Sequence, residues 1–249
     1  MPFGRPSTFA ASVASSGRRR PWLVALPTLW ALAAPAHAQA PAFLVRDINT
    51  VPVAVGSAPA LLVQIGATTF FAAWTPQTGY ELWKSDGTEG GTVLVKDVQP
   101  GPGSSLPGFF ADDALLVDVN GTLYFAADDG VNGVELWKSD GTAAGTVLVE
   151  DINLGAGSSA PSYLTNVSGT LFFAASNGVD GIELWKSDGT AAGTVLVKDI
   201  SPFAEPDSSS SPSFLTNVSG TLFFRADDGV YGVGDELWKS DGTEAGTGS

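Results

Sequence analysis

Glu81-Leu82-Trp83-Lys84-Ser85-Asp86-Gly87-Thr88 is the stretch that decides the fold, because the same eight residues recur three more times without a substitution. The later copies begin at Glu135, Glu183 and Glu236, which places successive tryptophans 54, 48 and 53 residues apart. Strict identity at such a period indicates a repeat architecture. A residue that is present in every repeat is expected to serve the scaffold, so we interpret this octapeptide first as a structural unit.

We expect the octapeptide to form a strand followed by a turn. Its aspartate would accept backbone N–H groups across the turn, as in an Asx turn, and the next glycine would take a positive φ. Its tryptophan would fill the space between neighbouring sheets, with the indole N–H directed at one acceptor. Its glutamate would pair with the lysine of the same copy. These structural roles fall to Glu81, Trp83, Asp86, Gly87, Glu135, Trp137, Asp140, Gly141, Glu183, Trp185, Asp188, Gly189, Glu236, Trp238, Asp241 and Gly242.

The third repeat shows four short runs of β-branched and aromatic residues separated by turn residues, which is the signature of hairpins. Its expected strands are Pro161–Val167, Thr170–Ala175, Ile182–Lys186 and Thr194–Ile200, with a tight turn at Ser168-Gly169. Four strands in about 50 residues is the size of a propeller blade. Several runs are continuously apolar, which predicts strands buried on both faces. The sequence therefore predicts an all-β fold, a β-propeller of four-stranded antiparallel blades, with a β-solenoid as the competing repeat fold.

The repeats span approximately 49–98, 99–152, 153–200 and 201–249 within a domain of residues 39–249. Residues 42–48 match the segment that follows each octapeptide, so they are a candidate closing strand for the last blade. Two arrangements stay open: a closed four-bladed ring, for which we expect a monomer, or a fragment of a larger propeller.

Glu-Leu-Trp-x-x-Asp-Gly-Thr resembles the signature of the secreted bacterial ELWxxDGT-repeat proteins, and the resemblance extends from Ala42 to Thr247. It implies an exported or surface protein without an agreed activity. The turn also distantly resembles the Asp-box of sialidase-type propellers, although here the aromatic residue precedes the turn. The Asp-box is itself structural, so this resemblance implies no activity.

Residues 1–38 have the layout of a secretory signal peptide. Arginines at 18–20 precede an apolar run from Trp22 to Ala34, and Ala36-His37-Ala38 supplies the small-x-small cleavage pattern. We expect ordinary secretion, with the twin-arginine route as the alternative, to the periplasm, cell envelope or exterior. Beyond the signal, no segment has the length and apolar character of a membrane span.

Removal of the signal would leave 8 basic and 26 acidic residues and no His, Cys or Met. This composition excludes disulfides, thiolate nucleophiles and imidazole chemistry in the mature chain. It also argues against nucleic acid, because phosphate binding requires clustered Lys and Arg. We therefore expect no cofactor, with Ca²⁺ as the one candidate. Its oxygen ligands would come from the acidic turns, at Asp128, Asp129, Asn132, Asn177, Asp180, Asp227, Asp228 and Asp235.

The sequence favours a secreted or cell-envelope module with no catalytic residues, which serves binding or structural and adhesive interactions. Its partner would be an extracellular glycan or protein, held where loops converge. The alternative is an extracellular carboxylate-based glycan hydrolase, for which Asp112 and Asp113 are the first candidates to mutate.

Overall fold

The computed structural model describes residues 44–50, 56–106, 116–202, 208–230 and 234–249. Every described strand belongs to the unit Phe43–Ser249. The proposed signal peptide, as well as Asp112 and Asp113, lies outside the described residues. In the described part, no helix is long and apolar enough to cross a membrane.

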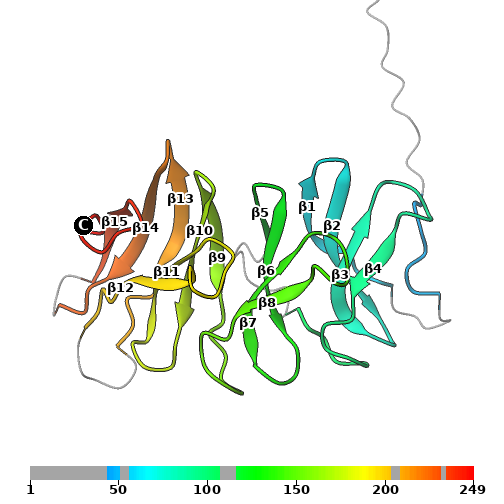
Figure 1. Ribbon diagram of the computed structural model, residues 1–249, viewed down its shortest axis with the longest axis horizontal. Helices are drawn as coiled ribbons and strands as arrows, with labels where there is room; N and C mark the ends of the chain where they lie inside the picture. Colours follow the sequence, from blue (N-terminus) through cyan, green and yellow to red (C-terminus); the bar gives the residue numbers. More distant parts are fainter. Residues whose placement is uncertain (1–43, 51–55, 107–115, 203–207, 231–233) are drawn as a thin grey trace, which may run out of the picture. The chain divides into compact units, whose positions relative to one another are not determined.

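The strands form four antiparallel sheets, each built from strands consecutive in the chain (Figure 1). We call the sheets blades one to four. Blade one contains β1 (Ala60–Ile65), β2 (Thr68–Thr75), β3 (Gly79–Ser85) and β4 (Val93–Lys96). Blade two contains β5 (Leu116–Val119), β6 (Thr122–Asp128), β7 (Val134–Ser139) and β8 (Val147–Glu150).

Blades three and four repeat this up-and-down order. Blade three contains β9 (Ser162–Val167), β10 (Thr170–Ser176), β11 (Ile182–Ser187) and β12 (Val195–Lys198). Blade four contains β13 (Ser213–Val218), β14 (Thr221–Asp227) and β15 (Asp235–Ser240). The four predicted strands of the third repeat are confirmed, and their observed ends differ from the predicted ends by no more than two residues. The all-β prediction, with four antiparallel sheets that resemble propeller blades, is confirmed as well.

Tight two-residue turns join the first and second strands of blades two to four. Both turn residues have a positive φ, as at Ser168 (52°) and Gly169 (90°). Two successive residues in this region define a type I′ hairpin, whose twist matches the flanking strands. The predicted turn at Ser168-Gly169 is therefore confirmed.

The first strands of successive blades lie next to one another: β1 contacts β5, β5 contacts β9, and β9 contacts β13. Asparagine side chains form hydrogen bonds between the first strands in two of these three contacts. The Asn166 amide donates to the Asp118 carbonyl at 2.9 Å, and the Asn217 amide donates to the Asn166 carbonyl at 3.0 Å. Adjacent innermost strands of this kind are the arrangement found in propeller blades.

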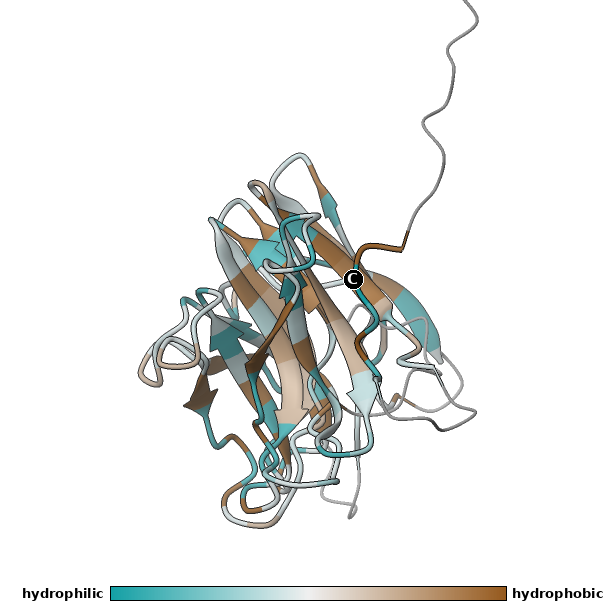
Figure 2. Cartoon of the chain, turned by 90° about the vertical axis from the view of Figure 1, so that its right-hand side faces the viewer, coloured by the Kyte–Doolittle hydropathy of each residue, from teal (hydrophilic) through white to brown (hydrophobic). Residues whose placement is uncertain are grey.

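In blades one to three, the second and third strands are buried along most of their length. In β6, five consecutive residues from Leu123 to Ala127 are buried. This confirms that the apolar runs of the second strands are covered on both faces. The same expectation for the Val-Leu-Val runs of the fourth strands is wrong, since Val147 and Val195 are 36% and 38% exposed. Figure 2 shows hydrophobic residues, in brown, along the strands and hydrophilic or neutral residues over many of the connecting turns.

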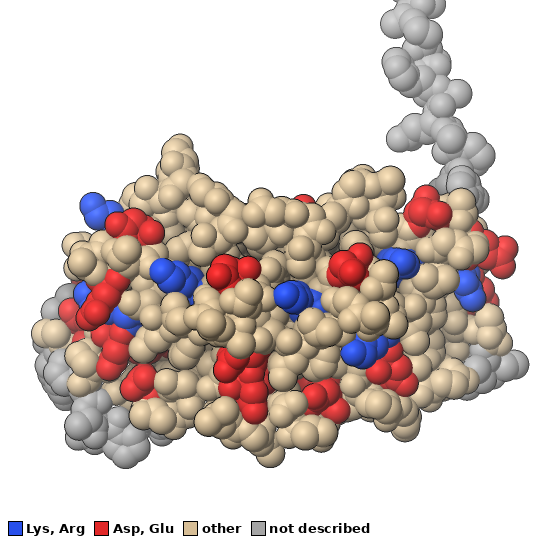
Figure 3. Space-filling view, viewed as in Figure 1, with Lys and Arg blue, Asp and Glu red and all other residues tan. Residues whose placement is uncertain are grey.

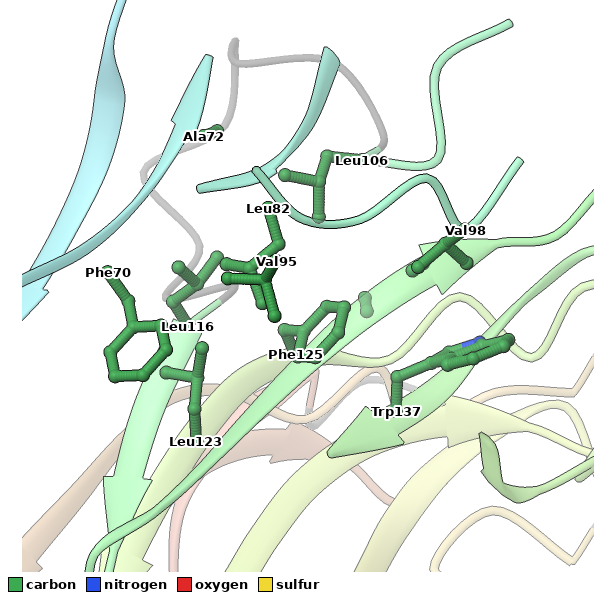
Figure 4. Packing of buried hydrophobic residues seen from close by; sticks show 12 residues of the cluster. Phe70, Ala72, Leu82, Val95, Val98, Leu106, Leu116, Leu123, Phe125 and Trp137 are labelled. Atoms are coloured by element: carbon green, nitrogen blue, oxygen red, sulfur yellow. The ribbon is translucent and has the colours of Figure 1, made fainter. Parts of the chain in front are cut away.

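The core consists of clusters between neighbouring blades rather than one central cluster. In the cluster between blades one and two, Val95 and Val98 lie beside Phe125 and Trp137 (Figure 4). Equivalent clusters join blade two to blade three and blade three to blade four. Each blade is thus stabilised by apolar burial against its neighbour, as in repeat proteins.

Residues 44–50 lie against blade one. Ile48 packs on Phe71, Ala73 and Trp83, and Arg46 donates to the Thr92 carbonyl at 2.6 Å. Blade four has three strands among the described residues, followed by a single antiparallel bridge between Lys239 and Gly248. Whether residues 42–48 close a ring with blade four stays a prediction.

Candidate functional site

The turn of the octapeptide is held by its own side chains. The Asp86 Oδ1 accepts from the Thr88 amide at 2.9 Å and from the Thr88 hydroxyl at 2.7 Å. Gly87 has a φ of 88°. The hydroxyl and amide of Thr88 hold the pKa of Asp86 below its usual range, because both stabilise the carboxylate. The other copies have the same bonds, at Asp140–Thr142, Asp188–Thr190 and Asp241–Thr243, so the predicted Asx turn is confirmed.

A glycine and a threonine just beyond the octapeptide complete the turn, and the sequence interpretation missed both. A Cβ on Gly91 would lie 2.0 Å from the Asp86 carboxylate, so only glycine fits. The Thr92 hydroxyl bonds the Ser85 hydroxyl at 2.7 Å and donates to the Thr88 carbonyl at 2.7 Å. The recurrence of these pairs was the available signal: Gly91-Thr92, Gly145-Thr146, Gly193-Thr194 and Gly246-Thr247.

The glutamate that opens each of the first three octapeptides is completely buried. The Glu81 carboxylate accepts from the Val98 amide at 3.1 Å, and from the Ser105 amide and hydroxyl at 3.2 and 2.5 Å. These donors belong to the linker that crosses to blade two. Glu135 and Glu183 hold Ser159 and Ser210 in the same way. The buried glutamate therefore fixes the crossover to the next blade.

Burial raises the pKa of Glu81 to about 7, although the hydrogen bond from Ser105 and three backbone amides oppose this shift. The pKa values of Glu135 and Glu183 are raised for the same reason. The expected pairing of Glu81 with Lys84 is wrong. In a strand, residues three apart point to opposite faces, and here the glutamate bonds the linker instead.

Two consecutive serines in each linker carry this attachment. Ser105 binds Glu81, while the Ser104 hydroxyl accepts from the Tyr80 amide at 3.0 Å. A signal was present in the sequence, because Ser-Ser-x-Pro recurs in the linkers at Ser104–Pro107, Ser158–Pro161 and Ser209–Pro212.

The lysine and tryptophan of the octapeptide act between blades. The Lys84 Nζ donates to the Gly141 carbonyl of blade two at 2.7 Å, and Lys138 and Lys186 repeat this contact one blade further on. The Trp137 ring lies in the cluster between blades one and two, with the Lys96 Nζ 5.6 Å from its centroid. The predicted position between sheets is confirmed for Trp137, Trp185 and Trp238, whereas Trp83 packs on its own blade and on Ile48. The expected acceptor for the indole N–H is wrong, since the four octapeptide indoles have none among the described residues.

The candidate calcium ligands are engaged in turn hydrogen bonds. The Asp129 Oδ1 accepts from the Val131 and Asn132 amides at 2.9 and 2.8 Å. Further bonds of this kind cap the turns at Asp128, Asn177, Asp180, Asp227 and Asp228, and Asp235 pairs with Arg225. Over the described part of the chain, no group of three or more His, Cys, Asp or Glu is arranged to hold a metal ion.

A small polar cavity lies between blades three and four, beside the octapeptide turn. Its volume is about 190 Å³, and its polar lining includes Ser168, Thr170, Lys186, Ser240 and Asp241. Hydroxyls, an amine and a carboxylate at one opening offer both donors and acceptors to a hydroxylated ligand. On the face drawn in Figure 3, lysines and arginines are interspersed with acidic residues, so no continuous basic surface is present there.

Neither a family model nor a curated protein sequence matches this chain. Solved structures with similar folds include a mutant puromycin hydrolase, at 16% identity and a TM-score of 0.47 over 71% of this chain and 25% of that one. A putative TolB from Agrobacterium tumefaciens is 13% identical, with a TM-score of 0.41 over 72% of this chain and 59% of that one.

An alpha-L-arabinofuranosidase from Clostridium thermocellum is 19% identical, with a TM-score of 0.30 over 73% of this chain and 67% of that one. This chain thus spans only part of the length of each of these proteins. The similarities concern the propeller fold alone, and no statement about activity follows from them.

Proposed function

We propose that this protein is a secreted or cell-envelope repeat module of the ELWxxDGT kind, which binds an extracellular glycan or protein and has no catalytic centre. The observation that carries the proposal is that the polar side chains of the octapeptide are engaged in hydrogen bonds that hold the fold together. Its glutamate, serine, aspartate and threonine are bonded within the blade or to the linker, and its lysine is bonded to the next blade.

The carboxylates with raised pKa values support a structural role for this motif. A general acid must reach its substrate, whereas Glu81, Glu135 and Glu183 are fully buried and enclosed by linker donors. Perturbed pKa values also arise in structural hydrogen-bond networks, and this network repeats identically in three blades. Because the blades repeat, their glutamates have equal environments, whereas glycoside hydrolysis requires two carboxyl groups in different environments.

For the ligand we favour a glycan, and for its position the cavity between blades three and four. Sugar hydroxyls both donate and accept, and the lining of the cavity combines the Ser168 and Thr170 hydroxyls with Lys186 and Asp241. The Asp241 carboxylate stays ionised, because the hydroxyl and amide of Thr243 hold its pKa below the usual range. Secretion is supported by the composition of residues 1–38, and the acidic chain suits an extracellular surface.

A binding and hydrolysis screen on one panel of immobilised glycans tests the proposal. We expect reversible retention of the protein on some glycans, with no release of reducing sugar. The matched variants are Thr170→Trp, which fills the cavity, and Thr122→Trp, which makes the same change at the equivalent position of blade two, no residue of which lines this cavity. Retention should be lost in the first variant and kept in the second.

Release of sugar that disappears on mutation of Asp112 and Asp113 would instead establish the hydrolase alternative. Retention that survives Thr170→Trp would move the binding site elsewhere on the surface. Retention on no glycan would leave a protein partner as the ligand, to be sought by the same comparison of variants.

A further inference from the structure

Blade four exposes repeat positions that the other blades bury. Leu237 is 68% exposed, whereas its counterparts are 0% exposed: Leu82, Leu136 and Leu184. Phe214 is 66% exposed, and Glu236 is exposed although the other octapeptide glutamates are buried. We call this surface of β13, β14 and β15 the trailing face of blade four. In blades one to three, the equivalent face is covered by the next blade.

Blade one exposes the opposite side of the same interface. Leu62 is 67% exposed, whereas Leu164 and Leu215, at the same register position of β9 and β13, are 2% and 9% exposed. A largely apolar cavity of about 360 Å³ opens here, bordered by Leu44, Leu62, Phe71 and Gly87. We call this surface of blade one, together with residues 44–48, the leading face.

The two faces are the halves of an interface that the chain already forms three times. Between blades three and four, the Lys186 Nζ donates to the Gly242 carbonyl, and a Cβ on Gly242 would lie 3.0 Å from the Phe172 ring. Lys239 and Phe223 occupy the positions of Lys186 and Phe172 on the trailing face. On the leading face, Gly87 has the position of Gly242 but has nothing within 4 Å of an added Cβ.

The backbone is complementary as well. Among the described residues, β15 pairs along its length only with β14, apart from the bridge to Gly248. Leu44-Val45-Arg46 matches Leu94-Val95-Lys96, the segment that pairs with β3 in blade one. The Arg46 side chain donates to the Thr92 carbonyl as Lys96 donates to the Thr146 carbonyl. The segment therefore stands where the fourth strand of a preceding blade would stand, and an open strand edge readily accepts such a strand.

We propose that a second copy of this chain docks its leading face on the trailing face of blade four, so that Val45 and Arg46 of one copy continue the fourth strand that Gly248 begins in the other. A second copy is the occupant because both faces are exposed within the same molecule. Each copy uses one face of each kind, so the contact is heterologous and extends into larger assemblies unless it closes. Arg225 and Thr69 replace the buried Ala174 and Leu123, which makes the contact more polar than the internal ones and reversible.

Sedimentation velocity over a range of protein concentrations tests the proposal. The full-length protein should show dimers and larger species as the concentration rises. Leu237→Glu and Leu62→Glu each remove one face, and each should weaken association at least about tenfold, the effect of losing one interface anchor. Since both side chains are exposed in the single molecule, neither change should alter its melting temperature.

Mixing the two variants distinguishes this contact from others. Each variant keeps one intact face, so the mixture should form dimers and nothing larger. Val179→Glu is the control, since Val179 is 84% exposed in a turn away from both faces, and it should assemble as the unmodified protein does. Monomers at all concentrations, whether compact as in a closed ring or extended, would overturn the proposal. Association that neither face variant weakens, or a mixture that stays monomeric, would overturn it too.

Discussion

The first and fourth octapeptides have the same sequence but different surroundings. Glu81 is completely buried and binds the linker to blade two, while Glu236 is exposed. The turn that follows is the same in both copies, since the Thr88 hydroxyl lies 2.7 Å from Asp86 and the Thr243 hydroxyl 2.7 Å from Asp241. The octapeptide thus contains a turn that is stable by itself and a strand whose role depends on the next blade.

This comparison separates the residues of the motif that make local contacts from those that need a neighbouring segment. The turn closes through contacts within eight residues, so every copy forms it. The glutamate, leucine and lysine of the strand need a linker or a neighbouring blade. Variants at equivalent positions of copies one and four therefore measure how much stability the neighbour contributes.

The largest difference is expected for Glu81→Ala against Glu236→Ala. The first change leaves the buried amide and hydroxyl of Ser105 without an acceptor, and each unsatisfied buried donor costs about 1–3 kcal/mol, so we expect a loss of about 3 kcal/mol or more. The second change removes an exposed side chain and should stay within about 0.5 kcal/mol. Urea denaturation measures both, and equal losses would contradict the assignment of Glu81 to the linker.

The turn should respond equally in both copies. Alanine at Gly91 or at Gly246 would place a Cβ 2.0 or 2.1 Å from the aspartate of its turn, and relief of such an overlap costs about 1–3 kcal/mol. Gly90→Ala is the matched control, because nothing lies within 4 Å of an added Cβ there. The midpoint of thermal unfolding should fall for the first two variants and not for the third. A loss confined to one copy would show that the turn is not self-contained.

The pH dependence of stability should separate the same two glutamates. Burial raises the pKa of Glu81 from 4.5 to about 7, so between these values the folded chain holds a proton that the unfolded chain has released. Its contribution is complete below pH 4.5 and is lost as the pH rises through 7. Glu135 and Glu183 keep their own pH dependence, so the urea midpoints at pH 5 and pH 8 should move closer together in Glu81→Gln without becoming equal, and should keep their spacing in Glu236→Gln.

The local features of this fold and its division into blades could be predicted from the sequence, whereas side-chain partners that lie far apart along the chain could not. Strand limits in the third repeat and the turn at Ser168-Gly169 follow from residue types within a few positions. The partner of Glu81 is Ser105, which lies 24 residues further on in a linker, and pattern reasoning did not connect the two. Only the repetition of Ser-Ser-x-Pro pointed to it.

The candidate site divides in the same way. The Asx bond of Asp86 was predicted because it is local, while the steric need for Gly91 depends on where the Asp86 carboxylate lies. The error over Lys84 has a geometric cause. Its charge suggested a partner on its own strand, but its strand position directs it to the Gly141 carbonyl of the next blade.

The smallest difference in stability is expected between Lys84→Met and Lys239→Met. This pair tests most directly whether a neighbouring blade contacts the lysine. Methionine keeps most of the side-chain length but removes the bond to the Gly141 carbonyl, so Lys84→Met should cost about 1 kcal/mol. Among the described residues no further blade covers Lys239, so its replacement should cost nothing measurable in dilute protein, where copies are separate. At concentrations where copies associate, Lys239→Met should weaken the association, because the lysine would then reach the Gly87 carbonyl of the neighbouring copy. A cost in dilute protein equal to that of Lys84→Met would mean that blade four already has a partner within its own chain, and the two ends would then have to meet.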